Sequence, residues 1–194
     1  SSDVCSSDLE MYMFPPQNPN LLPERFFNNE ISILQNFWGG RLTAEAAVFL
    51  ITGENLIQFA IVDGKPRNIN SGRVNNRGFE LELRGRVTEN FEISSNYSFL
   101  SMKNPVLAAP ERMFNANIHY SPGKFKLSAG IQSIKNLYLS IAPVLEMESY
   151  TLLNASVSYS DKIKRLGYTL FIKGDNLTGA KYSINPGFPM LGAM

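Results

Sequence analysis

Strict alternation of apolar and polar residues, in eight separate stretches, is the property that most constrains what this chain can fold into. The clearest stretch runs from Gly78 to Val87. A period of two residues indicates a β-strand, because successive side chains of a strand point to opposite faces. One face of this strand would carry only charged side chains, which need water: Glu80, Glu82, Arg84 and Arg86. The sequence therefore predicts strands with one apolar and one hydrated face.

The expected strands are joined by connections of alternating length. Short connections follow the first, third, fifth and seventh strands, and Gly39-Gly40 is expected to form a two-residue hairpin turn. Longer ones follow the second, fourth and sixth, including a strand-like piece at 56–62 and a loop of about 17 residues after the sixth strand. This pattern predicts an all-β, antiparallel up-and-down arrangement. The expected strands span 30–38, 41–50, 73–87, 91–99, 114–120, 125–132, 153–159 and 168–175.

Composition excludes some classes of protein. No run of about 18 apolar residues is present, so a membrane-spanning helix is not expected. A membrane β-barrel stays possible, because alternation dilutes the hydropathy of each strand. The net charge of +1 gives no indication of a nucleic-acid partner.

The apolar faces could meet different surroundings. A soluble sandwich or a lipocalin-like binder would bury them, whereas an outer-membrane barrel turns them toward lipid and encloses the charges in a wet lumen. Aromatic residues flank the short connections, which is typical of a membrane-interface belt: Trp38, Phe91, Tyr120, Phe125, Tyr159 and Tyr168. We therefore expect a transmembrane barrel, with these residues facing its lumen: Glu80, Glu82, Arg84, Arg86, Asn115, Asn117 and His119.

No catalytic, cofactor-binding or metal-binding residue is predicted. His119 is the only histidine, and it shares the polar register of Asn115 and Asn117. Glu80 and Glu82 alternate with apolar residues beside two arginines, as a hydrated wall requires. We expect a protein that is not an enzyme and that carries no cofactor.

The first nine residues are set apart from the fold. Residues 1–9 resemble the translation of a sequencing adapter, a laboratory sequence, and the alternative is a genuine Ser-rich disordered tail. Cys5, the only cysteine, lies in this segment, so the expected domain at 10–194 has no disulfide or thiolate metal site.

Four motifs, in their order and spacing, resemble the carboxy-terminal part of the β-barrel of TonB-dependent outer-membrane receptors. They are Asn18–Glu24, Asn75–Glu82, Asp175-Asn176-Leu177 with Lys181-Tyr182, and Asn185–Met190. The resemblance implies a barrel of about 22 strands with an amino-terminal plug. It also implies coupling to the TonB-ExbB-ExbD complex and import of ferric siderophores, haem, cobalamin or glycans. We expect the plug and the TonB-contacting box to lie outside this sequence, so no ligand-binding residue is carried over, and we also expect the last strand of the barrel to be missing.

Residues 10–194 are thus expected to be a partial barrel of eight or nine strands in the outer membrane of a Gram-negative bacterium. The TonB complex would be contacted through the missing amino-terminal part. The expected cargo is a ferric siderophore or a similar iron or cobalamin complex. A complete small outer-membrane barrel with a structural or adhesion role is the alternative. Because open strand edges leave backbone groups that lipid cannot satisfy, the chain alone is not expected to insert as a stable monomer.

Overall fold

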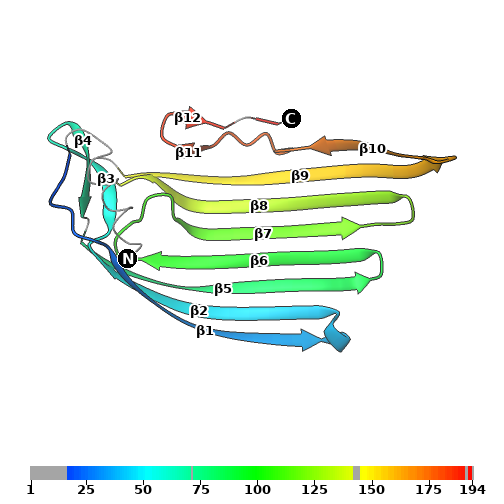
Figure 1. The fold of residues 1–194 in the computed structure, drawn as a ribbon, viewed down its shortest axis with the longest axis horizontal. Coiled ribbons are helices and arrows are strands. Elements are labelled where there is room, and N and C mark those ends of the chain that lie inside the picture. Colours follow the sequence, from blue (N-terminus) through cyan, green and yellow to red (C-terminus); the bar gives the residue numbers. More distant parts are fainter. Residues whose placement is uncertain (1–16, 71, 142–144, 191, 194) are drawn as a thin grey trace.

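Eight long strands form a single antiparallel sheet in this computed structural model, which describes residues 17–70, 72–141, 145–190 and 192–193. The strands follow one another across the sheet in the order β1-β2-β5-β6-β7-β8-β9-β10 (Figure 1). The all-β, up-and-down prediction is therefore confirmed. The strands are β1 (Arg25–Phe37), β2 (Leu42–Glu54), β5 (Arg73–Thr88), β6 (Phe91–Met102), β7 (Pro110–Tyr120), β8 (Phe125–Ser140), β9 (Glu146–Ile163) and β10 (Leu166–Gly174).

One short turn and two short strand pairs lie outside the eight-stranded sheet. A short 3-10 turn, η1 (Trp38–Gly40), joins β1 to β2. The hairpin of β3 (Ile57–Val62) and β4 (Lys65–Asn70) occupies the long connection between β2 and β5. The pair β11 (Ser183–Asn185) and β12 (Phe188–Pro189) follows β10. The predicted tail at residues 1–9 lies outside the described residues.

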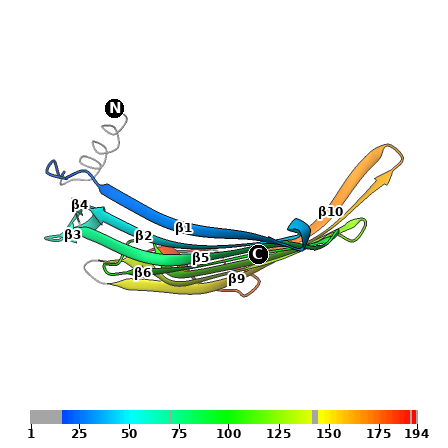
Figure 2. The same cartoon turned by 90° about the horizontal axis from the view of Figure 1, so that it is seen from below.

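The sheet is one curved layer, and it is open (Figure 2). Within the described residues, β1 pairs only with β2 and β10 pairs only with β9, so the strands do not close on one another. Tight connections gather at one end of the sheet, which we call the turn end. The longer connections lie at the other end, which we call the loop end. None of the described residues forms a helix long and apolar enough to cross a membrane.

The two faces of the sheet differ as the alternation predicts. Ile31, Val48, Phe79 and Phe99 are direct cross-strand partners and form one apolar row on what we call the apolar face. These apolar residues are largely uncovered: Ile31 is 77% exposed and Leu81 is 47% exposed. A soluble sandwich would bury such side chains against a second sheet. Among the described residues the buried apolar cluster is small, comprising Ile134, Leu137 and Leu139 with Met113 and Tyr150 packed against it.

Several predicted connections are wrong in length, among them the first turn and the loop after the sixth expected strand. Phe37 pairs with Leu42, so the first turn contains four residues, Trp38–Arg41, and the predicted two-residue turn at Gly39-Gly40 does not form. The loop of about 17 residues shrinks to 141–145, because β8 continues to Ser140 and β9 begins at Glu146. Register shifts after Ile134 and Tyr138 explain this error. A bulge adds a residue and reverses the parity of the pattern, which hides the strand from sequence analysis.

The segment after β10 is anchored to β9 by a compact corner at Asn176. The Asn176 side chain donates to the Ala180 carbonyl (2.9 Å) and accepts from the Ala180 N–H (3.0 Å). The Leu177 N–H donates to the Leu153 carbonyl (2.7 Å), which extends the β10 edge along β9. Beyond the corner, the Tyr182 ring stacks on Tyr150 at 4.0 Å. The motif Asp175-Asn176-Leu177 is therefore a structural corner.

Candidate functional site: the polar face of the sheet

The seven residues predicted to share the hydrated side do lie on one face, which we call the polar face. Cross-strand pairing aligns Glu82 with Asn96 and Asn96 with Asn115, and the Asn115 amide donates to Asn96 Oδ1 (2.8 Å). The next row aligns Arg84, Ser94 and Asn117. A third row begins with Arg86, Glu92 and His119 and ends at Lys173: Arg86, Glu92, His119, Ser128, Ser156 and Lys173.

Some charged side chains on this face form ion pairs with one another. Glu92 Oε1 accepts from Arg86 Nε (2.9 Å) and lies 2.8 Å from Arg86 Nη2. Glu82 forms an ion pair with Arg84 on the same strand. His119 Nδ1 shares a hydrogen bond with Ser128 Oγ (2.9 Å). The wall thus carries both signs of charge in contact with solvent.

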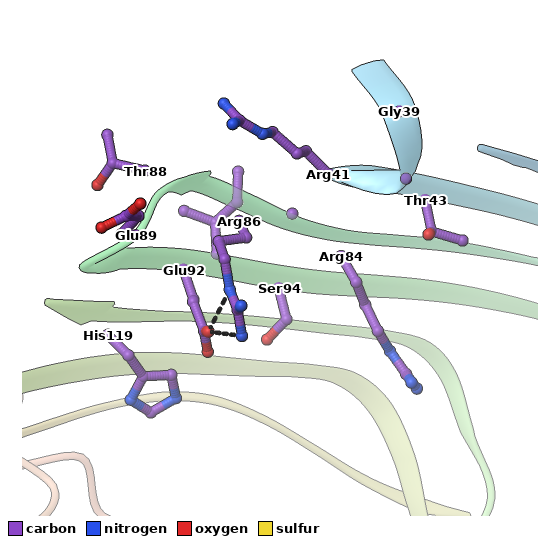
Figure 3. Close-up of a pocket in the computed structure, with 13 residues that line it drawn as sticks. Gly39, Arg41, Thr43, Arg84, Arg86, Thr88, Glu89, Glu92, Ser94 and His119 are labelled. Atoms are coloured by element: carbon purple, nitrogen blue, oxygen red, sulfur yellow. Dashed lines mark hydrogen bonds and ion pairs between the residues drawn. The ribbon is translucent and has the colours of Figure 1, made fainter. Parts of the chain in front are cut away.

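A hollow of about 600 Å³ lies on this face at the turn end. Figure 3 shows Arg84, Arg86 and Glu92 projecting to the same side of the strands. A second hollow of about 340 Å³ is lined by Asn115, Asn117 and Lys173. Since His119 lines both hollows, they are neighbours along the polar face.

The structure adds members that sequence analysis did not place in the site. Arg41 and Glu92 line the first hollow, and Lys173 lines the second. Glu92 and Lys173 alternate with apolar neighbours, so the sequence correctly predicted that they lie on the polar face. The pairing partner of each residue depends on register, which alternation does not encode. Within the described part of the chain, no group of three or more His, Cys, Asp or Glu side chains is placed to hold a metal ion.

Most of the predicted aromatic belt forms contacts at the turn end of the apolar face. The Phe91 and Tyr120 rings meet edge to face with centroids 6.1 Å apart. Tyr159 lies between Phe125 (5.0 Å) and Tyr168 (6.3 Å). Trp38, in the first turn, is 75% exposed. Amphipathic rings at one height are the arrangement that a membrane interface favours.

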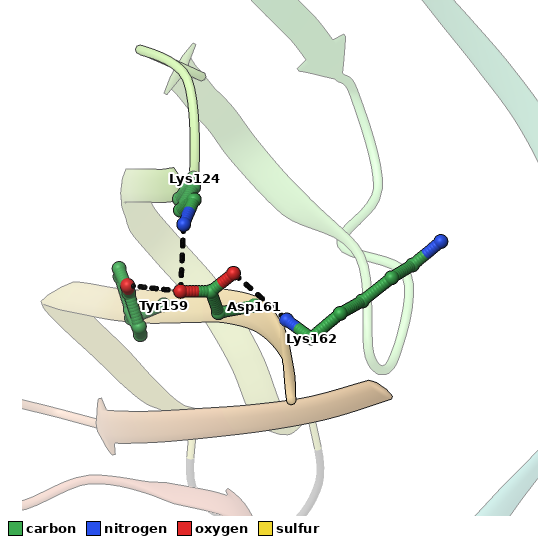
Figure 4. A network of polar contacts seen from close by, with 4 residues as sticks. All are labelled: Lys124, Tyr159, Asp161 and Lys162. Atoms are coloured by element: carbon green, nitrogen blue, oxygen red, sulfur yellow. Dashed lines mark hydrogen bonds and ion pairs between the residues drawn. The ribbon is translucent and has the colours of Figure 1, made fainter. Parts of the chain in front are cut away.

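A polar network fixes the end of this aromatic cluster (Figure 4). Asp161 Oδ2 accepts from Lys124 Nζ (2.6 Å) and from the Tyr159 hydroxyl (2.8 Å). Asp161 Oδ1 accepts from the Lys162 N–H (2.8 Å). The hydrogen bond from Lys124 to the carboxylate raises the pKa of the Lys124 ammonium above its ordinary value. The turn between β7 and β8 is thereby tied to the end of β9.

An open antiparallel sheet with one exposed apolar face and one charged face defines part of the wall of a β-barrel. The family model described as TonB dependent receptor-like, beta-barrel, matches residues 7–177. The chain belongs to this family.

Named relatives and solved structures agree with the fold. The ferrioxamine receptor of Yersinia enterocolitica is 26% identical over 157 residues, which are 75% of this chain and 22% of that protein. BauA, the ferric preacinetobactin receptor from Acinetobacter baumannii, has a TM-score of 0.65 at 20% identity, covering 82% of this chain and 26% of its own. The copper transporter OprC has a TM-score of 0.70 at 16% identity, covering 91% of this chain and 31% of its own. The chain spans 56% and 22% of the lengths of two curated relatives.

Proposed function

We propose that this chain forms part of the barrel wall of a TonB-dependent importer in the outer membrane of a Gram-negative bacterium. The single observation that carries the proposal is the uncovered apolar face of a one-layer sheet. Exposed apolar surface of this extent is unfavourable in water and favourable against acyl chains. Family membership supports the same placement.

In this proposal the polar face lines an aqueous lumen. Its ion pairs are exposed, since the Arg86 and Glu92 side chains keep 66% and 49% of their surface accessible. A wet lumen accommodates such charges without the desolvation cost of a closed interior. The residues that we assign to the lumen are Glu80, Glu82, Arg84, Arg86, Asn115, Asn117 and His119.

The proposed cargo is a ferric siderophore or a similar metal complex. A ferrioxamine receptor among the relatives and a ferric preacinetobactin receptor among the structural neighbours support iron. The copper transporter among the neighbours supports the broader class of metal complexes. The polar face carries both signs of charge, so it favours neither an anionic nor a cationic complex. Energy would come from the TonB-ExbB-ExbD complex through a part of the receptor outside residues 10–194.

The alternative, a complete eight-stranded barrel with a structural or adhesion role, requires β1 to pair with β10. In the described residues both strands keep one unpaired edge. Unpaired backbone groups are costly in lipid, so further strands are needed on both sides. This observation favours the larger barrel.

Cysteine labelling tests the orientation of the two faces. Leu81→Cys and Glu82→Cys change neighbouring residues of β5 that lie on opposite faces, in a background with Cys5→Ser. A water-soluble maleimide should label Glu82→Cys in outer membranes and leave Leu81→Cys unlabelled. Equal labelling of both, or the reverse preference, would contradict the proposed placement.

Uptake tests the cargo. A strain that lacks the gene should lose growth on a ferric siderophore as sole iron source and accumulate less radiolabelled iron. Supplying the complete receptor should restore both. Normal growth on every ferric siderophore tried, with lost uptake of cobalamin or copper, would reject the iron proposal and keep the importer.

A further inference from the structure

One row of side chains on the apolar face changes from apolar to basic as it crosses six strands. Direct cross-strand partners share a face of a sheet. Arg112 on β7 pairs with Lys135 on β8, and both are exposed. The complete row is Ile31, Val48, Phe79, Phe99, Arg112 and Lys135.

Two cations directly opposite each other destabilise a sheet unless an anion lies between them. The ion pairs found within the described residues include neither Arg112 nor Lys135. Glu111 precedes Arg112 but points to the other face, where its carboxylate accepts from Asn136 and Tyr138, both at 2.7 Å. Among the described residues, neither cation is therefore held in an ion pair.

Arg112 lies beside two aromatic rings. The Arg112 guanidinium lies over the Phe99 ring, 5.8 Å from its centroid. The Phe79 ring lies 5.6 Å from Phe99 on the other side. A ligand of this site would thus need an anionic head beside an apolar body.

The position of the pair along the strands matches one boundary of a membrane. Phe125 belongs to the aromatic cluster at the turn end, and Lys135 lies ten residues further along β8. At about 3.3 Å per residue and a tilt of about 40°, this is roughly 25 Å across the bilayer, the height of a barrel's apolar band. The outward residues between them carry no charge: Leu127, Ala129, Ile131 and Ser133.

Further basic residues continue toward the loop end on the same face. Arg77 lies two residues from Phe79 on β5, on the side of the loop end. Nearer the loop end still, a hollow of about 620 Å³ is lined by Arg25, Arg73 and Lys103. The acid at this hollow, Glu54, is held by Arg73 at 3.4 Å. The surface above the apolar band is therefore positively charged.

We propose that Arg112 and Lys135 bind the phosphate groups of an anionic lipid at the loop-end surface of the membrane. The acyl chains of this lipid pack on Phe79 and Phe99. The inference rests on the proposed function, because it requires the apolar face to lie in lipid.

Lipid titration followed by native mass spectrometry tests the site. The complete receptor is purified in detergent and titrated with diphosphorylated lipid A, and in parallel with zwitterionic phosphatidylcholine. Lipid A should bind in preference to phosphatidylcholine. The double variant Arg112→Gln with Lys135→Gln should bind lipid A roughly thirtyfold more weakly, the effect expected of two cations near a membrane surface.

Two further variants separate charge from folding. Arg112→Lys with Lys135→Arg keeps both charges and should retain the lipid. Lys126→Gln with Arg165→Gln removes two cations at the turn end and should bind as the wild type does. Unchanged binding by the glutamine double variant, or displacement of the lipid by inorganic phosphate at equal concentration, would overturn the lipid site.

A separate measurement on the wild type tests whether the receptor is in the outer membrane at all, by cell fractionation and by heat-modifiable mobility. If the receptor is not in the membrane, both proposals fail, whereas a membrane-inserted receptor with unaffected lipid binding rejects this inference alone.

Discussion

Arg86 on β5 and Glu92 on β6 face each other across the strand pair, and a single carboxylate oxygen, Oε1, receives both contacts from the guanidinium, at 2.9 Å and 2.8 Å. Both side chains remain about half exposed or more, at 66% and 49%. An ion pair in this state reports the polarity of its surroundings, because its strength depends on how much water reaches it.

The coupling energy of this pair should therefore be small. We expect a double-mutant cycle with Arg86→Gln and Glu92→Gln to give less than about 1 kcal/mol, as exposed pairs do. Urea unfolding of the complete receptor in detergent micelles measures it. A coupling of about 3 kcal/mol or more would mean that the pair is shielded from water, in conflict with a wet lumen.

Asn176 determines the corner after β10, and its replacement should loosen this end of the sheet. Asn176→Ala removes the paired contacts with Ala180 and places a side chain without hydrogen bonds at a φ of +52°. Together these losses should lower the free energy of unfolding by about 2–3 kcal/mol. Limited proteolysis after residue 174 and urea unfolding measure the change.

Two other substitutions at this position separate the causes. Asn176→Gly relieves the backbone strain but lacks the hydrogen bonds, so it should be milder than Asn176→Ala. Asn176→Asp keeps the Oδ1 acceptor for the Ala180 N–H and should be milder too. If Asn176→Ala, Asn176→Gly and Asn176→Asp lower the free energy of unfolding equally, the Asn176 side chain is not what anchors the segment after β10.

Gly78, in the motif Asn75–Glu82, should tolerate no side chain. A Cβ there would meet the Phe99 carbonyl oxygen and the Phe49 ring, the latter at 2.6 Å from Cζ. Gly78→Ala should thus lower the free energy of unfolding by about 1–3 kcal/mol through overpacking. Gly167→Ala is the matched control, since nothing lies within 4 Å of its Cβ position. Equal stability of the two variants in urea would contradict the overpacking, because both the Phe99 carbonyl and the Phe49 ring would then have to give way without cost.

The sequence predicted the faces of the strands better than their pairing. Alternation from Phe79 to Arg86 is unbroken, so it was enough to predict that four charged residues share one face of β5: Glu80, Glu82, Arg84 and Arg86. That Glu92 lies opposite Arg86 was not predicted, because a bulge between Arg86 and Thr88 sets the register there. Register depends on turn geometry and bulges, which residue type alone determines weakly.

The basic pair on the apolar face could not be predicted for the same reason. The fifth strand was expected to begin at Phe114, which left Arg112 in a loop, and Lys135 fell in the loop expected after the sixth strand. The structure extends β7 to Pro110 and β8 to Ser140. The bulge at Asn136, whose φ is +54°, interrupts the alternation next to Lys135. Only the three-dimensional pairing brings the two cations together.

Charge placement on opposite faces gives the most direct test of the membrane placement. Leu81 lies on the apolar face, and Leu81→Arg should cost about 2–4 kcal/mol, as cations do on the lipid face near the bilayer midplane. Ser98→Arg is the matched control, because Ser98 lies on the polar face directly opposite Glu80. It should assemble as the wild type does. Outer-membrane fractions analysed for heat-modifiable mobility measure assembly of both variants. In a soluble protein the order would reverse, since an arginine on an uncovered apolar face improves solubility and leaves folding unchanged.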